Sequence, residues 1–300
     1  MISGHLWLDA ALAADGSHGY LAAMTNVLRC HVLDTGHCLA SEHHLIRGGV
    51  RRTIECHSVA ALLGHPRHGW LLWDAGYAPR LWDATHWLPF RLYRWATPLR
   101  LRPELAIVAQ LPRFGLTAAD VKYVIVSHFH ADHIAGLRDF PRAELWAAQT
   151  AYADVAGRTG LAALRRAFIP SLLPPDFERR AILVPPFAGP AVEPFGATYD
   201  IFGDGSAVLV NLPGHARGQL GLLARTDRGL LFFVADSCWL SAAYRENRPP
   251  HWLTHFFIDN VRDMRATLGA LGKYALAHPD VELIPSHCPE AFRRHVRDGP

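Results

Sequence analysis

The sequence predicts an α/β fold class, with two β-sheets packed together and helices on the outside. Runs rich in β-branched and other apolar residues occur in both halves of the 300-residue chain, and each half also contains segments with helical periodicity. Half of the residues are hydrophobic and 19% are charged, so the chain can bury a sizeable core. Since no linker or low-complexity run divides the sequence, we expect a single domain over residues 24–300, preceded by an N-terminal extension, residues 1–23.

In the N-terminal half, strands are expected where apolar, β-branched runs lie between turn residues. They cover residues 26–34, 51–63 and 69–74. Thr117 and Asp120 have the spacing of a helix-capping pair, and they precede a further strand that ends at His128. Residues 143–168, rich in Ala, Leu and Arg, are expected to be mostly helical.

The C-terminal half begins with a proline-rich segment, residues 169–194. We expect a loop or crossing segment there, because proline cannot donate a hydrogen bond to a sheet. A helix is expected at about 258–277, where apolar residues recur at helical spacing, and a short helix is expected from Pro289. The strands of this half are expected at residues 197–202, 206–213, 219–226, 229–236 and 281–287.

Composition narrows the class of protein. The net charge of +3 is small, and no block of Lys and Arg favours nucleic acid as a partner. No apolar run of about 18 residues is present, so no membrane span is expected, and the N-terminus is a poor signal peptide. Five cysteines are scattered without a CxxC pair, which argues against a disulfide framework and for a reducing, cytoplasmic location.

The segment "VIVSHFHADHIAG", residues 124–136, carries the strongest functional signal. It places His128, His130, Asp132 and His133 directly after a strand. Imidazole nitrogens and carboxylate oxygens suit zinc, iron or manganese, and this spacing rarely arises by accident. The segment therefore predicts a metal site at the end of the strand.

Further candidate ligands follow three later strands. "NLPGHARGQLG" places His215 in a turn, "LLFFVADSCW" places Asp236 after an apolar run, and "VELIPSHCPE" places His287 after the last strand. A lone carboxylate after a buried strand is costly to desolvate unless it has a partner. Together with the first cluster, these residues predict a site for two metal ions.

With these motifs and "LLWDAG" (71–76), the chain resembles the metallo-β-lactamase-fold hydrolases from about residue 26 to the C-terminus. The resemblance implies an αββα sandwich of two mixed sheets flanked by helices, with a dinuclear site at one edge. It implies that the first ion is held by His128, His130 and His215. It implies that the second is held by Asp132, His133 and His287, with Asp236 bridging the two.

The resemblance also implies roles around the metals. Asp74 matches an aspartate that orients a ligand histidine. The similar turn "LDTG" at 33–36 comes too early in the chain, so Asp34 is interpreted as structural. Two divalent ions, zinc with iron or manganese as alternatives, would generate a bridging hydroxide as the nucleophile. Asp132 would then pass the proton to the leaving group.

The expected reaction is hydrolysis of an ester or lactone in a small, partly apolar substrate. The motifs are most similar to the N-acyl homoserine lactonase branch, in which a tyrosine three residues after the bridging aspartate helps to hold the substrate. Here Trp239 occupies that position, and Tyr244 could replace the tyrosine only if a helix turned it inward. The insertion at residues 77–115, rich in Trp, Phe, Leu and Arg, is interpreted either as a lid or pocket wall, or as a packed hairpin or homodimer contact.

Other activities remain as alternatives at the same site. A thioesterase or phosphodiesterase would use the same ions. An oxidoreductase similar to persulfide dioxygenases would use a single iron. A nuclease is not favoured, because the sequence shows neither an added domain nor a basic surface.

Overall fold

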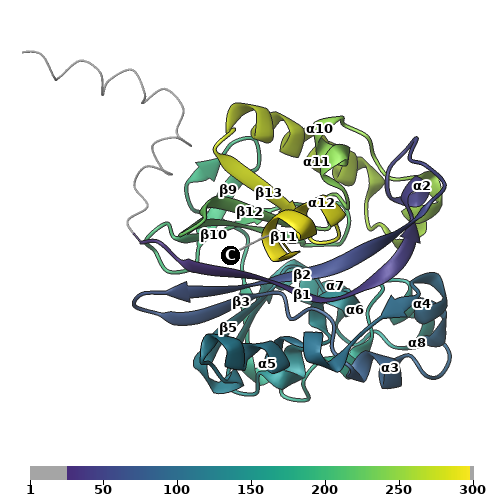
Figure 1. Cartoon of the computed structure of the whole chain (residues 1–300), viewed down its shortest axis with the longest axis horizontal. Helices are drawn as coiled ribbons and strands as arrows, with labels where there is room; N and C mark the ends of the chain where they lie inside the picture. Colours follow the sequence, from purple (N-terminus) through teal and green to yellow (C-terminus); the bar gives the residue numbers. More distant parts are fainter. Residues whose placement is uncertain (1–25, 298–300) are drawn as a thin grey trace, which may run out of the picture.

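The computed structural model describes residues 26–297, so the expected extension at residues 1–23 lies outside the described part of the chain. Two mixed sheets face each other, and helices lie on the outer side of each (Figure 1). The sequence-based fold class, an αββα sandwich, is therefore confirmed.

The first sheet has seven strands in the order β4-β1-β2-β3-β5-β6-β7. The strands β4, β1, β2 and β3 pair antiparallel, whereas β3, β5, β6 and β7 pair in parallel. Their bounds are β1 (Arg29–Ser41), β2 (Thr53–His65), β3 (Gly69–Trp73), β4 (Leu99–Arg100), β5 (Val121–Val126), β6 (Glu144–Ala148) and β7 (Ala181–Val184).

The second sheet has six strands in the order β13-β12-β11-β10-β9-β8. All its pairs are antiparallel except β12 with β13. Their bounds are β8 (Ala191–Val192), β9 (Gly196–Asp200), β10 (Ala207–Asn211), β11 (Leu220–Thr226), β12 (Gly229–Ala235) and β13 (Val281–Pro285).

Most helices are short, and the longest, α11, covers the outer face of the second sheet together with α10 (Figure 1). The α-helices are α2 (Glu42–Leu45), α3 (Arg80–Ala84), α4 (Arg91–Ala96), α5 (Ile107–Gln110), α6 (Ala131–Ile134), α7 (Gln149–Val155), α8 (Gly160–Leu164), α9 (Phe177–Arg180), α10 (Ser241–Arg245), α11 (Val261–Ala277) and α12 (Pro289–Phe292). Short helices of 3₁₀ or π type are η1 (Pro103–Leu105), η2 (Leu111–Phe114), η3 (Ala118–Asp120), η4 (Leu137–Asp139), η5 (Pro170–Leu172), η6 (Trp252–Phe257) and η7 (Arg293–Arg297).

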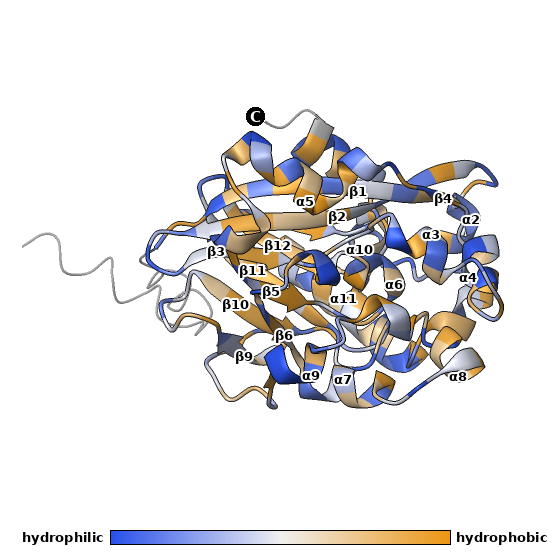
Figure 2. Ribbon diagram, turned by 90° about the horizontal axis from the view of Figure 1, so that it is seen from below, coloured by the Kyte–Doolittle hydropathy of each residue, from blue (hydrophilic) through white to orange (hydrophobic). Residues whose placement is uncertain are grey.

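Strand β12 illustrates why the central strands are apolar on both faces. Leu231 and Phe233 point into the core between the sheets, whereas Phe232 and Val234 pack in a second core with α11. Successive side chains of a strand alternate between the two faces, so a strand covered on both sides reads as a continuous apolar run. Figure 2 shows this pattern as hydrophobic strands in the interior.

Two local predictions were wrong. Residues 143–168 are not mostly helical, because they begin with β6, where Leu145 and Ala147 are buried. Ala and Leu favour helix in isolation, but here the neighbouring strands β5 and β7 provide backbone hydrogen bonds on both sides. The proline-rich segment 169–194 likewise contains β7 and β8 rather than only loop.

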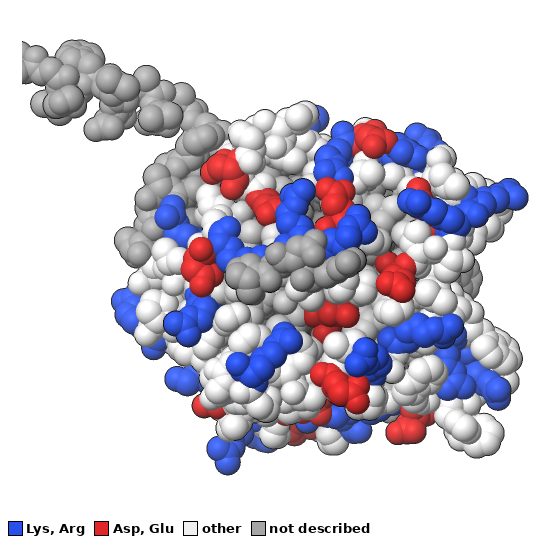
Figure 3. All heavy atoms as spheres, viewed as in Figure 1, with Lys and Arg blue, Asp and Glu red and all other residues white. Residues whose placement is uncertain are grey.

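The surface carries both signs of charge. On the face drawn in Figure 3, Lys and Arg side chains are interspersed with Asp and Glu. Within residues 26–297, no helix has the length and hydropathy needed to cross a lipid bilayer. All five cysteines are buried and free.

Candidate metal centre

The seven predicted ligand residues come together where strands of both sheets end. His128 and His130 follow β5, and Asp132 and His133 lie in the short helix α6. The other three follow strands of the second sheet, namely His215, Asp236 and His287, after β10, β12 and β13. All seven side chains are buried. Neighbouring parallel strands end at the same edge of a sheet. The ligand residues after β12 and β13 therefore lie at one edge of the second sheet, and those after β5 lie at the edge where the parallel strands of the first sheet end.

The ligand atoms form two groups. One contains His128, His130, His215 and Asp236, and the other contains Asp132, His133 and His287. Within each group, the candidate atoms lie within 4.8 Å of one another. The grouping matches the two sets that the resemblance implies.

Asp236 lies between the two groups. Its Oδ2 is 3.3 Å from His215 Nε2 and 3.0 Å from His287 Nε2, and its Oδ1 is 3.2 Å from His133 Nε2. Residues from both groups therefore face one carboxylate, which is the arrangement required of a bridging ligand.

Hydrogen bonds on the far side of the rings fix the tautomers. His133 Nδ1 donates to Asp74 Oδ2 at 2.7 Å, and His287 Nδ1 donates to the carbonyl oxygen of His57 at 2.7 Å. Ser127 Oγ donates to Asp74 at 2.8 Å and therefore accepts from His128 Nδ1, which is 3.0 Å away. In all three rings Nε2 is therefore the nitrogen that can bind a metal, as is usual for histidine ligands.

The electrostatic environments of the two groups differ. Burial holds the pKa of His128 well below its usual value, and lowers the pKa of His130 to about 3 and of His215 to about 4, so these rings are neutral. Burial also opposes a charge on His133, but Asp74 and the other nearby carboxylates outweigh it and raise its pKa to about 10. An ion entering the second group must therefore displace a proton from His133.

Three buried atoms test whether the residues fit metal ions. His128 Nε2, His133 Nε2 and Asp236 Oδ1 are buried and make no well-aligned hydrogen bond, although the last two face each other at 3.2 Å. Leaving such groups unpaired is costly, and all three belong to the two groups. The donor set of imidazole and carboxylate fits two divalent ions.

The two predicted pocket residues have different outcomes. Trp239 lies beside the site, where its Nε1 donates to Asp236 Oδ2 at 3.2 Å and its ring meets that of His215 edge-on. Tyr244, on α10, lines a separate groove with residues of α11 and β13. The structure does not bring Tyr244 to the metal centre, because its helix packs on the outer face of the sheet.

Tyr93, in the 77–115 insertion, lies at the site although the sequence pattern did not predict it there. This residue of α4 is buried, and its hydroxyl lies 3.4 Å from Asp132 Oδ1. A tyrosine among exposed tryptophans such as Trp87 and Trp95 gave no distinguishing signal. Part of the insertion packs on the core, and the Tyr93 side chain reaches the site, whereas a role as a lid or homodimer contact stays a prediction.

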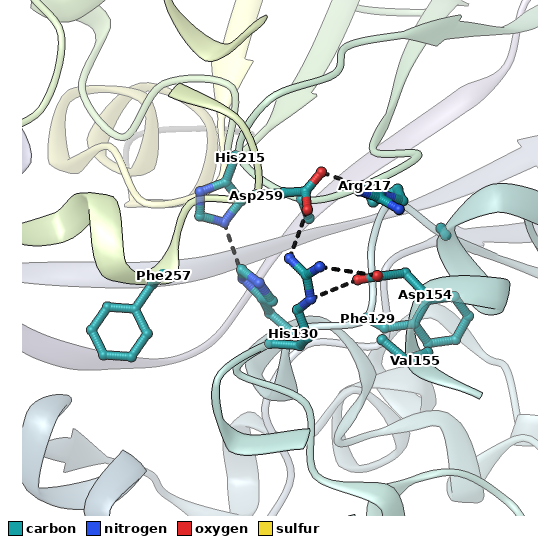
Figure 4. Close-up of a pocket in the computed structure, with 11 residues that line it drawn as sticks. Phe129, His130, Asp154, Val155, His215, Arg217, Phe257 and Asp259 are labelled. Atoms are coloured by element: carbon teal, nitrogen blue, oxygen red, sulfur yellow. Dashed lines mark hydrogen bonds and ion pairs between the residues drawn. The ribbon is translucent and has the colours of Figure 1, made fainter. Parts of the chain in front are cut away.

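A pocket adjoins the first group at His130 and His215 (Figure 4). Phe129, Val155 and Phe257 provide apolar surface. Its polar wall consists of paired charges: Arg166 binds Asp154 at 2.9 Å and Asp259 at 2.6 Å, and Arg217 lies 3.4 Å from Asp259. Both arginines that line the pocket are therefore neutralised by carboxylates.

Comparisons with known proteins agree with this geometry. Residues 53–231 match the model described as "Metallo-beta-lactamase superfamily". An N-acyl homoserine lactonase, AttM of Azorhizobium caulinodans, is 27% identical over 281 residues, which cover 90% of this chain and 96% of the relative.

Two solved structures share the fold. An N-acyl homoserine lactone hydrolase with the product N-hexanoyl-L-homoserine at its catalytic metal centre gives a TM-score of 0.71 at 16% identity, covering 90% of this chain and 97% of the other. AidC, a dizinc quorum-quenching lactonase, gives a TM-score of 0.61 at 16% identity, with 88% and 90% coverage.

Proposed function

Because the chain belongs to the metallo-β-lactamase superfamily, we propose that it is a lactone hydrolase with two ions in the two ligand groups. It is a metal-dependent hydrolase. In the proposal, His128, His130 and His215 hold one ion, and Asp132, His133 and His287 hold the other. Asp236 would be shared between them, since it lies within 3.3 Å of histidine nitrogens from both groups. The donor set favours zinc.

Individual residues have different proposed roles in hydrolysis. Two divalent ions held by these residues would supply an activated water and a Lewis acid for the carbonyl oxygen. Asp132, whose Oδ2 is 3.2 Å from His287 Nε2, would carry a proton to the leaving oxygen. Tyr93 orients the other oxygen of this carboxylate. Trp239 uses its one N–H on Asp236, so it provides a ring surface rather than a donor to the substrate.

The residues that line the pocket beside His130 and His215 are the basis for the proposed substrate class. Its apolar side chains suit an acyl chain, and its arginines are already paired with carboxylates. An anionic phosphodiester would find no unpaired cation among the residues that line this pocket, whereas their apolar side chains would contact the acyl chain of a neutral N-acyl lactone. The relative named as an N-acyl homoserine lactonase supports the same substrate class.

The test is a substrate panel on protein purified without chelators. Metal content is measured first, and then hydrolysis of N-acyl homoserine lactones, aryl esters, thioesters and bis(p-nitrophenyl) phosphate. We expect two ions per chain and the highest kcat/KM on a lactone. Faster cleavage of the phosphodiester than of every lactone and ester would refute the substrate assignment and leave the metal assignment intact.

A further inference from the structure

A separate set of imidazole and carboxylate groups lies on the first sheet, outside the seven residues of the metal centre. His37 on β1 stands directly opposite His57 on β2, and Glu55 precedes His57 by two residues. Opposed residues share a face of the sheet, as do residues two apart on a strand, so the three side chains project together. Their ligand atoms lie within 4.8 Å of one another.

A β-bulge adds Asp34 to the same face. Asp34 is opposite Val59, and His37 is opposite His57, so β1 has one more residue than β2 between these pairs. Without the extra residue, Asp34 and His37 would point to opposite faces. Gly36 in the bulge has a φ of 115°, and its N–H donates to Asp34 Oδ1 at 3.1 Å.

The spacing of the polar atoms is that of ligands around an ion. Glu55 Oε1 is 3.7 Å from His37 Nε2, and Glu55 Oε2 is 3.6 Å from His57 Nε2. Each Glu55 oxygen thus faces one histidine nitrogen at a separation that exceeds a hydrogen-bond length and is near the roughly 3.4 Å between two ligand atoms that each lie about 2.1 Å from an ion.

The protonation of the two imidazoles suits such an ion. His57 Nδ1 lies 3.1 Å from Asp34 Oδ1, so its proton is on Nδ1 and Nε2 keeps its lone pair. The ring of His57 also stacks on Phe292, with centroids 3.5 Å apart. Burial lowers the pKa of His37 against the opposing charge of Glu55, so this ring is neutral at pH 7.

We propose that His37, Glu55 and His57 form a further site for a divalent transition metal of the zinc class. Asp34 orients His57 in it, and the fourth position is open to solvent because the Glu55 side chain is 61% exposed. The site is independent of the proposed lactonase activity. It adjoins the metal centre through one contact, because the carbonyl oxygen of His57 accepts the hydrogen bond from His287 Nδ1.

A second histidine cluster provides a matched control. His65, His68 and Asp204 also lie close together. However, His65 Nδ1 accepts hydrogen bonds from the backbone N–H groups of Arg67 and His68, so its Nε2 carries the proton that it donates to Asp204. With no lone pair left on His65, this cluster should not bind an ion.

The experiment counts zinc ions per full-length chain after equilibrium dialysis in buffered zinc. His37→Gln and Glu55→Gln should each bind one ion fewer than the wild type, whereas His68→Gln should match it. The difference in count is the readout, so the result does not depend on how many ions the metal centre holds. Circular dichroism and thermal unfolding of each variant check that it is folded. Glu55→Gln should fold normally, because the Glu55 side chain is 61% exposed. Equal counts in the wild type and both variants, or the same loss in His68→Gln, would overturn the proposal.

Discussion

Replacing Asp74 by asparagine tests whether hydrogen bonds outside the metal centre control its affinity for metal. Asp74 Oδ1 accepts from the backbone N–H of Ser127 at 2.8 Å, and Oδ2 accepts from Ser127 Oγ at 2.8 Å and from His133 Nδ1 at 2.7 Å. Its φ is 57°, a left-handed conformation that asparagine also tolerates. Asp74→Asn therefore changes the hydrogen bonds and the charge without adding backbone strain.

The consequence for His133 follows from donors and acceptors. If asparagine Oδ1 continues to accept from Ser127, its NH₂ group faces His133 Nδ1 and must donate to it. The neutral imidazole then holds its single proton on Nε2, the nitrogen that faces Asp236 and would bind the metal. Loss of such an orienting partner typically lowers metal affinity by about 10- to 100-fold, or about 1.4–2.7 kcal/mol.

The assay is competition for zinc against a chromogenic chelator, with thermal unfolding as a check on folding. The weaker of the two ions should lose about 10- to 100-fold in affinity, and lactone hydrolysis should fall in parallel. Asp204→Asn is the control, because it alters a similar carboxylate–histidine pair, with His65 at 2.9 Å, outside the centre. If Asp74→Asn binds two ions with wild-type affinity, the proposed role of Asp74 is wrong.

Three further predictions concern the same centre. Asp236→Ala should lose at least one ion and at least about 100-fold in kcat, since both groups face this carboxylate; a variant with two ions and full activity would contradict the bridging role. Tyr93→Phe should lower kcat roughly fivefold with little change in KM, because it removes one 3.4 Å contact worth about 1 kcal/mol; an unchanged kcat would show that Asp132 needs no such partner. On acidification, the ion held with His133 should leave first. Below the His133 pKa of about 10, binding of this ion releases a proton, so its affinity falls about tenfold per pH unit for each proton released. The pKa values of about 3 for His130 and about 4 for His215 leave the histidines of the other group unprotonated. Simultaneous loss of both ions between pH 8 and 5 would refute this order.

The sequence determined the donor types and their positions at the ends of strands. Apolar runs ending in His128, Asp236 and His287 could be read directly, because strand burial and the polar residue that follows are both local properties of the chain. The fold class also followed, since runs apolar on both faces require cover on both sides.

Tertiary structure decided which of these groups meet. Hydrophobic periodicity shows that a face is buried but not which segment covers it, so the contact of Tyr93 with Asp132 and the packing of Tyr244 away from the centre were not predictable. Strand β6 formed where local propensity favours helix, because two neighbouring strands supplied its hydrogen bonds. The bulge that places Asp34 beside His57 likewise depends on the register between β1 and β2, which pairing and not sequence pattern sets.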